Sequence, residues 1–136
     1  MKLLGALCIG LVLGLTSQVS AADADPKPAE FAKAKLSAAR KAYESYWKGR
    51  KEGVGFDAET LYRWSRRWLD SQREVNSAKG DQLTAVKAHL ERMKDLEKFV
   101  KQLVASGSKD GTLAQAAAGE FFRLEAELWL SQAKGK

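Results

Sequence analysis

Apolar residues recur at spacings of three and four along most of the chain, which is the period of amphipathic α-helices. The first such run predicts a helix from about Ala29 to Glu52. Its apolar face consists of Phe31, Leu36, Ala39, Tyr43, Tyr46 and Trp47, with lysines and arginines between them. We expect the helix to stop before Gly53-Val54-Gly55, because glycine tolerates the left-handed backbone that follows a helix end.

The second helix has the best-marked start in the sequence. Asp57 is a strong N-cap, and Phe56 before it is placed to pack on Leu61 as a hydrophobic staple. An apolar stripe of Leu61, Trp64, Trp68 and Val75 then predicts the buried face of this helix.

The segment around Lys79-Gly80-Asp81 has two interpretations. Gly80 followed by Asp81 is typical of one helix's end and the next helix's N-cap, which predicts a tight turn. Positions 64, 68, 72, 75, 79, 83, 86 and 90, however, keep a 4-4-3 spacing through the glycine. A continuous helix with an eleven-residue repeat also has this spacing, so the sequence leaves both alternatives open.

The rest of the chain predicts two more helical segments separated by a loop. The first has Leu83, Val86, Leu90, Met93, Val100 and Val104 on its apolar face, with Leu96 and Leu103 at the edge. Residues 106–111 are a loop by composition. Thr112 and Gln115 then form a capping box, which Leu113, Ala117, Phe121, Leu124 and Leu128 follow on one apolar face as far as about Ser131.

These patterns predict an all-α fold, an up-down bundle of three to four amphipathic helices. The alternative is a long central helix over residues 57–105, flanked by two antiparallel helices. Residues 29–132 are expected to form a single domain, and residues 133–136 a frayed tail.

The N-terminus has the pattern of a secretory signal peptide over residues 1–21. Lys2 precedes an apolar run over residues 3–16 that is too short to span a bilayer, and small residues follow it. Cleavage after Ala21 fits best, and cleavage after Ala22 or Ala24 also satisfies the rule. Residues 22–28, with two prolines, are expected to form an extended lead-in. We therefore expect an exported protein, periplasmic or extracellular, with no transmembrane span in its mature chain.

Removal of the signal peptide also removes Cys8, the only cysteine. The remaining chain of about 115 residues then has no thiol for disulfides, thiolate metal sites or thiol catalysis. A domain of this length buries roughly two-thirds of its unfolded surface. Its stability is therefore expected to come from packing, to which four tryptophans, five phenylalanines and three tyrosines contribute.

The formal net charge is +6, and the surplus sits mainly on the first predicted helix. Such a surface could meet an anionic polymer or an anionic lipid surface. The candidate residues for that contact are Lys33, Lys35, Arg40, Lys41, Arg63, Arg66 and Arg67. Since the basic residues surround the first helix more than they line one side, we favour a solvated face.

Arginines alternate with aromatic residues over residues 62–68. That pattern could stack on bases or sugars. Trp64 and Trp68, however, lie four residues apart on the face that holds Leu61. We therefore favour core packing for these tryptophans, with arginines at the border.

No residue set predicts a metal centre, a cofactor site or a catalytic group. His89 is the only histidine, and the helical positions at which zinc or di-iron motifs need a partner hold Met93 and Val86. Glu120, Glu125 and Glu127 are more simply explained as solvated or ion-paired carboxylates than as acid–base catalysts.

Several segments carry a resemblance to a known family. They are Ala39-Arg40, Ala42-Tyr43, Trp47, Leu61-Tyr62, Trp64-Ser65, Arg67, Ala88-His89-Leu90, Arg92-Met93, Arg123-Leu124-Glu125-Ala126-Glu127 and Trp129-Leu130. Together they resemble an uncharacterised family of small exported helical proteins from bacteria, notably planctomycete-type ones. The resemblance spans residues 36–130 and implies a bacterial, exported, all-helical domain, without an activity, a cofactor or a site.

Three roles fit these features. The first is a non-enzymatic interaction module that presents a face to a protein partner in the cell envelope. The second is binding of an anionic polymer or membrane surface through the basic first helix, and the third is a small periplasmic chaperone-like function. We expect no enzymatic activity.

Overall fold

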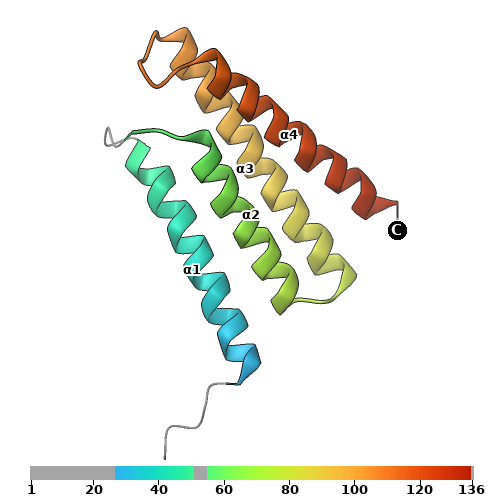
Figure 1. The fold of residues 1–136 in the computed structure, drawn as a ribbon. Coiled ribbons are helices and arrows are strands. Elements are labelled where there is room, and N and C mark those ends of the chain that lie inside the picture. The colour runs from blue at the N-terminus through green and yellow to red at the C-terminus, as the bar shows by residue number, and fades with distance from the viewer. Residues whose placement is uncertain (1–26, 51–54, 136) are drawn as a thin grey trace, which may run out of the picture.

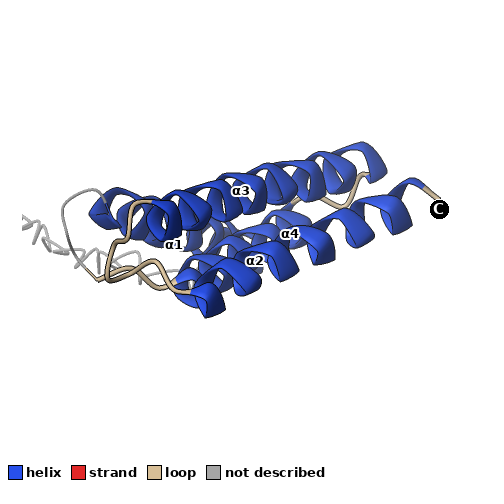
Figure 2. Cartoon of the chain, turned by 90° about the horizontal axis from the view of Figure 1, so that it is seen from above, coloured by secondary structure: helices blue, strands red, loops and turns tan. Residues whose placement is uncertain are grey.

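The computed structural model describes residues 27–50 and 55–135, which form four α-helices. They are α1 (Pro28–Gly49), α2 (Ala58–Val75), α3 (Lys79–Ala105) and α4 (Leu113–Lys134), joined by loops (Figures 1 and 2). The predicted all-α, up-down fold is confirmed. The predicted signal peptide with its cleavage site, Cys8 and residues 22–26 of the lead-in lie outside the described residues. Helix α1 ends at Gly49, three residues before the expected stop near Glu52.

The helices form an open array. Each helix packs on the next one along the chain, and α2 also contacts α4. Among the described residues, α1 and α4 do not approach each other, and they lie at opposite edges of the array (Figure 1). One side of α4 is therefore left without a covering helix.

Asp57 caps the start of α2, as the sequence predicts. Asp57 accepts hydrogen bonds from the backbone N–H groups of Glu59 and Thr60, at 3.3 and 3.0 Å. Phe56 packs against the core cluster that contains Leu61, as expected of a staple. A second cap at this helix start is unexpected, because it comes from another helix. The backbone N–H of Ala58 donates to Gln115 Oε1 of α4 at 3.1 Å. Thr112 caps Gln115 N–H as predicted, but the glutamine side chain caps α2 instead of completing its own capping box.

The central helix is broken, so the alternative of one continuous helix over residues 57–105 is wrong. The break is at residues 76–78, and Gly80 and Asp81 belong to the first turn of α3 rather than to the turn itself. Gln82 explains the position of the break. Its side-chain N–H group donates to the backbone oxygens of Arg73, at 2.9 Å, and of Asn76, which satisfies carbonyls at the end of α2.

The other helix ends differ little from the expected positions. Helix α1 begins at Pro28, one residue before the predicted start, and α4 continues to Lys134, into the predicted tail. Helix α3 ends in a Schellman motif, in which Gly107 and Ser108 donate to the carbonyls of Val104 and Leu103. Gly107 has a φ of 67°, which glycine adopts without strain.

The buried face of α2 is rotated from the predicted one. Ala58, Leu61, Ser65 and Leu69 are buried, whereas Trp64 and Trp68 are half-buried at the border of the core. The rotation places a serine hydroxyl at the centre of the interface with α3. The expectation that these two tryptophans form the core face is therefore corrected to a border position.

The core face predicted for α4 is wrong. Leu113, Phe121, Leu124 and Leu128 are exposed, and the helix buries Gly119, Phe122 and Ala126 instead. Small residues allow the close approach to α3: a Cβ atom at Gly119 would lie 3.2 Å from Glu97 Cα. Beside this contact, Glu97 accepts hydrogen bonds from Lys101, at 2.9 Å, and from Arg123, at 2.7 Å. Close approach and ion pairing together fix which face of α4 turns inward.

Two glycine-to-alanine substitutions test this close contact. Gly80→Ala adds a methyl group in open space within a helix, so it should raise the free energy of unfolding by up to about 1 kcal/mol. Gly119→Ala has a similar gain in helix propensity, but its methyl group presses on α3 and should cancel that gain. Urea unfolding followed by circular dichroism measures both. Equal stabilisation by the two substitutions would contradict the packing described here.

Candidate functional site

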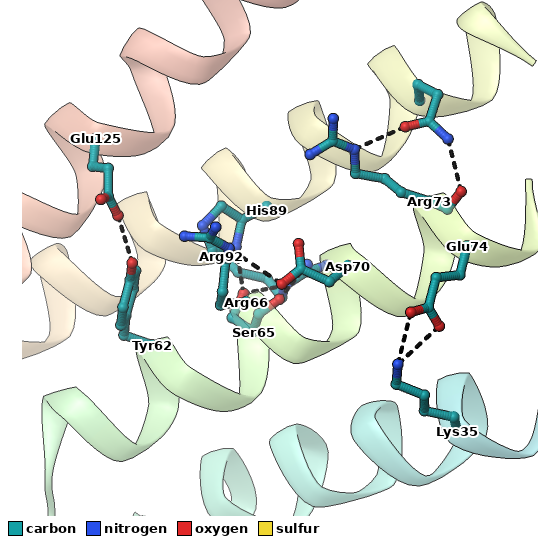
Figure 3. A network of polar contacts seen from close by, with 11 residues as sticks. Lys35, Tyr62, Ser65, Arg66, Asp70, Arg73, Glu74, His89, Arg92 and Glu125 are labelled. Atoms are coloured by element: carbon teal, nitrogen blue, oxygen red, sulfur yellow. Dashed lines mark hydrogen bonds and ion pairs between the residues drawn. The ribbon is translucent and has the colours of Figure 1, made fainter. Parts of the chain in front are cut away.

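A polar group is buried where α2, α3 and α4 meet. His89 of α3 is 0% exposed, and its Nδ1 lies 2.8 Å from the Oγ of Ser65 on α2, which is also fully buried (Figure 3). The imidazole ring stacks on Trp129 of α4, with ring centroids 5.5 Å apart. One side chain from each of three helices therefore meets at this point.

Arg92 is the donor in one hydrogen bond of this group. Its Nε donates to Ser65 Oγ at 2.7 Å, and a guanidinium group cannot accept. The second hydrogen bond joins Ser65 Oγ and His89 Nδ1, and the tautomer of the neutral ring decides which of the two atoms donates. The other ring nitrogen, Nε2, is buried without a hydrogen-bond partner in the described part of the chain.

Burial keeps His89 uncharged. Desolvation, helped by the positive charges of Arg92 and Arg66, lowers the pKa of His89 to about 3. Burial also lowers the pKa of Arg92 to about 10 and raises that of Tyr43 to about 12. Over the physiological range the group therefore holds one cation, on Arg92, and two neutral partners.

This geometry suits a structural role better than general acid–base catalysis. A catalytic base must lie within hydrogen-bond reach of a substrate proton. Ser65 and His89 are fully buried, and the serine oxygen already accepts from Arg92. Tyr62, which donates to Glu125 of α4 at 2.6 Å, makes a further bond between helices rather than an open acid–base pair (Figure 3).

Arginine side chains stack on all four tryptophans of the chain. The guanidinium carbon lies 3.4 Å from the ring centroid for Arg50 on Trp47, and 4.6 Å for Arg67 on Trp64. The corresponding distances are 4.1 Å for Arg92 on Trp68 and 4.2 Å for Arg66 on Trp129. The alternation of aromatics and arginines thus forms cation–π contacts at the border of the core.

The seven candidate polyanion-binding residues are divided between two helices. Lys33, Lys35, Arg40 and Lys41 lie on α1, and Arg63, Arg66 and Arg67 lie on α2. Lys35 pairs with Glu74 at 2.8 Å, and Arg40 pairs with Glu44 at 2.8 Å. Polyanion binding by this set stays a prediction, with part of its charge already balanced.

The three α2 arginines of this set make local contacts. Arg63 donates to Thr60 Oγ1 at 3.3 Å, and Arg67 lies over Trp64. Arg66 Nε lies 3.3 Å from Asp70 Oδ2, an ion pair without hydrogen-bond geometry. These contacts hold Arg63 and Arg67 against side chains of α2 itself.

Four of the six large apolar side chains that are exposed in the described residues lie on α4. Leu113, Phe121, Leu124 and Leu128 are 80, 60, 49 and 56% exposed. We call these four residues the α4 stripe. Glu120 and Glu127 each precede a member of the stripe by one position, and Glu127 pairs with Arg123 at 2.9 Å. The stripe is therefore apolar along its centre and acidic along one border.

Some of these features were missed at the sequence level. Ser65 lies four residues after Leu61 and four before Leu69, so helical spacing alone could have placed it in the core. No comparable signal identifies the α4 stripe as exposed, because apolar spacing indicates a face without saying which side is covered.

Neither a metal-binding cluster nor a membrane-spanning helix is found among the described residues. In residues 27–50 and 55–135, no cluster of three His, Cys, Asp or Glu side chains could hold a metal ion. None of the helices described has the length and hydropathy needed to cross a bilayer.

No protein-family model, curated protein or solved structure matches this chain.

The neutral state of His89 makes stability depend on pH. Its pKa is about 3 when folded and about 6.5 when unfolded, so the unfolded chain binds more protons between these values. Stability is therefore lost as the pH falls through this window, by about 2 kcal/mol between pH 7 and pH 5. Urea unfolding at both pH values should show this loss in the protein and a smaller one in His89→Gln, which cannot titrate. Equal losses in both would count against a neutral His89.

Proposed function

We propose that this chain is a non-enzymatic, exported interaction module that binds a helix of a protein partner in the cell envelope through the α4 stripe. The observation that carries the proposal is the exposure of four large apolar side chains on a helix at the edge of the array. Contiguous exposed apolar surface of this kind is typical of sites for protein association. The N-terminal pattern of residues 1–21 supports export.

The spacing of the stripe suits a helical partner. Phe121, Leu124 and Leu128 follow at three and four residues, as in the seam of paired helices. Helix α4 has 22 residues and is therefore about 33 Å long, which gives a partner helix several turns of contact. A helix that lays its apolar side along such a surface uses anchors at the same spacing.

Charge indicates what borders the partner's apolar side. Glu120 and Glu127 border the stripe, so a second copy that packed its own α4 here would bring carboxylates together. Like charges placed across an interface oppose association, whereas lysines and arginines complement these carboxylates. We therefore propose an amphipathic helix with basic borders as the partner's binding element.

Two designed peptides test the chemistry of this surface. Both are amphipathic helices with leucines at the spacing of the stripe, bordered either by lysines or by glutamates. The lysine-bordered peptide should bind the purified protein at least tenfold more tightly by fluorescence anisotropy, and less tightly as salt rises. Equal binding of the two peptides would contradict the proposed charge preference.

Paired substitutions locate the binding surface. Phe121→Ser with Leu128→Ser should abolish binding of the lysine-bordered peptide and change the free energy of unfolding by less than about 0.5 kcal/mol, because both residues are exposed. The matched control is Phe31→Ser with Tyr46→Ser, which removes exposed aromatics from α1. Loss of binding in the control, or its retention in the α4 variant, would overturn the assignment. If the protein proved to be a dimer, and if the α4 variant alone were a monomer, the stripe would instead be the interface with a second copy.

The other roles lead to different results in simple measurements. Anionic-polymer binding through α1 predicts retention on heparin that Lys33→Gln with Lys41→Gln removes. A chaperone-like role predicts that the protein suppresses aggregation of an unfolded client at equimolar concentration, and that Phe121→Ser with Leu128→Ser loses this effect. Binding of the two peptides with equal affinity, together with client protection, would favour the chaperone-like role over a specific partner.

A further inference from the structure

A groove opens at the end of the array opposite the Gly107 turn, on the inner side of α4. It has a volume of about 460 Å³ and lies between the end of α2, the start of α3 and the last turns of α4. Leu83, Val86 and Trp129 contribute apolar surface to it. Its volume is within the range of small-molecule sites, which is about 300–1,000 Å³.

The charges of the groove are all of one sign. Arg66, Arg73 and Lys79 line it, and no aspartate or glutamate is among its lining residues. Elsewhere on these helices lysines pair with carboxylates, as Lys94 does with Glu91 and Lys101 with Glu97, both within 3 Å. Of the groove's three cations, Arg66 alone has such a partner within the described part of the chain, namely Asp70, which lies outside the groove. The groove is therefore an electropositive pocket beside apolar surface.

Two of its arginines are held in place by contacts that leave part of the guanidinium group available. Arg73 Nε donates to Gln82 Oε1 at 2.8 Å, while the amide of Gln82 donates back to the Arg73 carbonyl (Figure 3). Arg66 lies over Trp129, 4.2 Å from the ring centroid. A fixed guanidinium group loses less entropy when it binds a carboxylate or phosphate.

We propose that this groove binds a small amphiphilic anion, with a carboxylate or phosphate group between Arg73 and Lys79 and an apolar body on Trp129, Leu83 and Val86. Guanidinium and ammonium groups recognise such anionic groups through charge-assisted hydrogen bonds. The apolar surface contributes through burial of the ligand's hydrocarbon. Tight binding should require both parts of the ligand. Inorganic phosphate has the charge without the apolar body, and an alcohol has the apolar body without the charge.

The groove and the α4 stripe are separate surfaces of the same helix. Trp129 and Ala133 turn toward the groove, whereas Leu124 and Leu128 are exposed on the outer side. A ligand in the groove would contact α2, α3 and α4 without covering the stripe. The ligand site therefore goes beyond the proposed partner binding, and one can fail without the other.

Calorimetric titration of the purified protein with decanoate, decanol and inorganic phosphate tests the proposal. Decanoate below its micelle concentration should bind at least tenfold more tightly than decanol or phosphate. Decyl phosphate should bind as well as decanoate, which separates the shared anionic chemistry from a preference for one head group. No heat of binding with either amphiphile up to millimolar concentration, or equal affinity for decanoate and decanol, would overturn the proposal.

Matched substitutions on α3 locate the binding. Lys79→Gln removes a cation of the groove, whereas Lys87→Gln removes an exposed lysine two turns further along the helix. Lys79→Gln should weaken decanoate binding at least fivefold and Lys87→Gln less than twofold. Equal effects of the two substitutions would contradict a specific site.

A spectroscopic readout covers the case in which a variant changes stability. The indole N–H signal of Trp129, assigned from Trp129→Phe, should shift with decanoate in an ¹⁵N correlation spectrum, while that of Trp47 on α1 stays in place. Phe121→Ser with Leu128→Ser should keep the decanoate affinity. A shift of Trp47 without one of Trp129, or loss of binding in the stripe variant, would place the ligand elsewhere.

Discussion

The structure depends on a half-buried arginine and a fully buried histidine that meet at a buried serine hydroxyl. Arg92 donates to Ser65 Oγ, which is in turn hydrogen-bonded to His89 Nδ1. The aromatic surfaces around this group come from the other helices, Tyr43 from α1 and Trp129 from α4. Since buried polar groups are costly when they are unpaired, the three side chains must keep these positions whenever the chain is folded. A single polar group thus relates all four helices.

The orientation of α4 about its own axis follows from the same polar group. Its inward positions must hold Trp129 on the histidine ring and Gly119 against the backbone of α3. With these positions fixed, the helical repeat directs Phe121, Leu124 and Leu128 outward. Because α1 lies at the far edge of the array, no helix among the described residues covers them. The exposed α4 stripe is therefore a consequence of how the core is built, and it supports the proposed role in binding a partner helix.

Much of this fold can be predicted from sequence. Local signals were reliable: Asp57 caps α2, Thr112 caps α4, and the loop after Ala105 ends α3 near the predicted place. Contacts between different helices were harder to predict from the sequence. Gln115 and Gln82 serve as caps for another helix, and such contacts depend on residues that are distant or ambiguous in sequence.

The functional surfaces were the hardest to predict, for a physical reason. Helical periodicity identifies two candidate faces on α4, one with larger apolar residues and one with Gly119, Phe122 and Ala126. Hydrophobic spacing predicts that the face with the larger residues is the core. Close packing on α3, however, requires the face with the small residues. The groove at Arg73 and Lys79 likewise exists only because α2 breaks at residues 76–78, a point that the sequence left open.

The ring nitrogens of His89 test the central group most directly, because the chain has no other histidine. Long-range ¹H–¹⁵N correlation spectra of the folded protein between pH 7 and pH 4.5 distinguish protonated from unprotonated ring nitrogens. The structure predicts a neutral ring, with one protonated and one unprotonated nitrogen, throughout this range. Titration of the ring near pH 6.5 would contradict the Arg92–Ser65–His89 arrangement, because it would require an accessible imidazole.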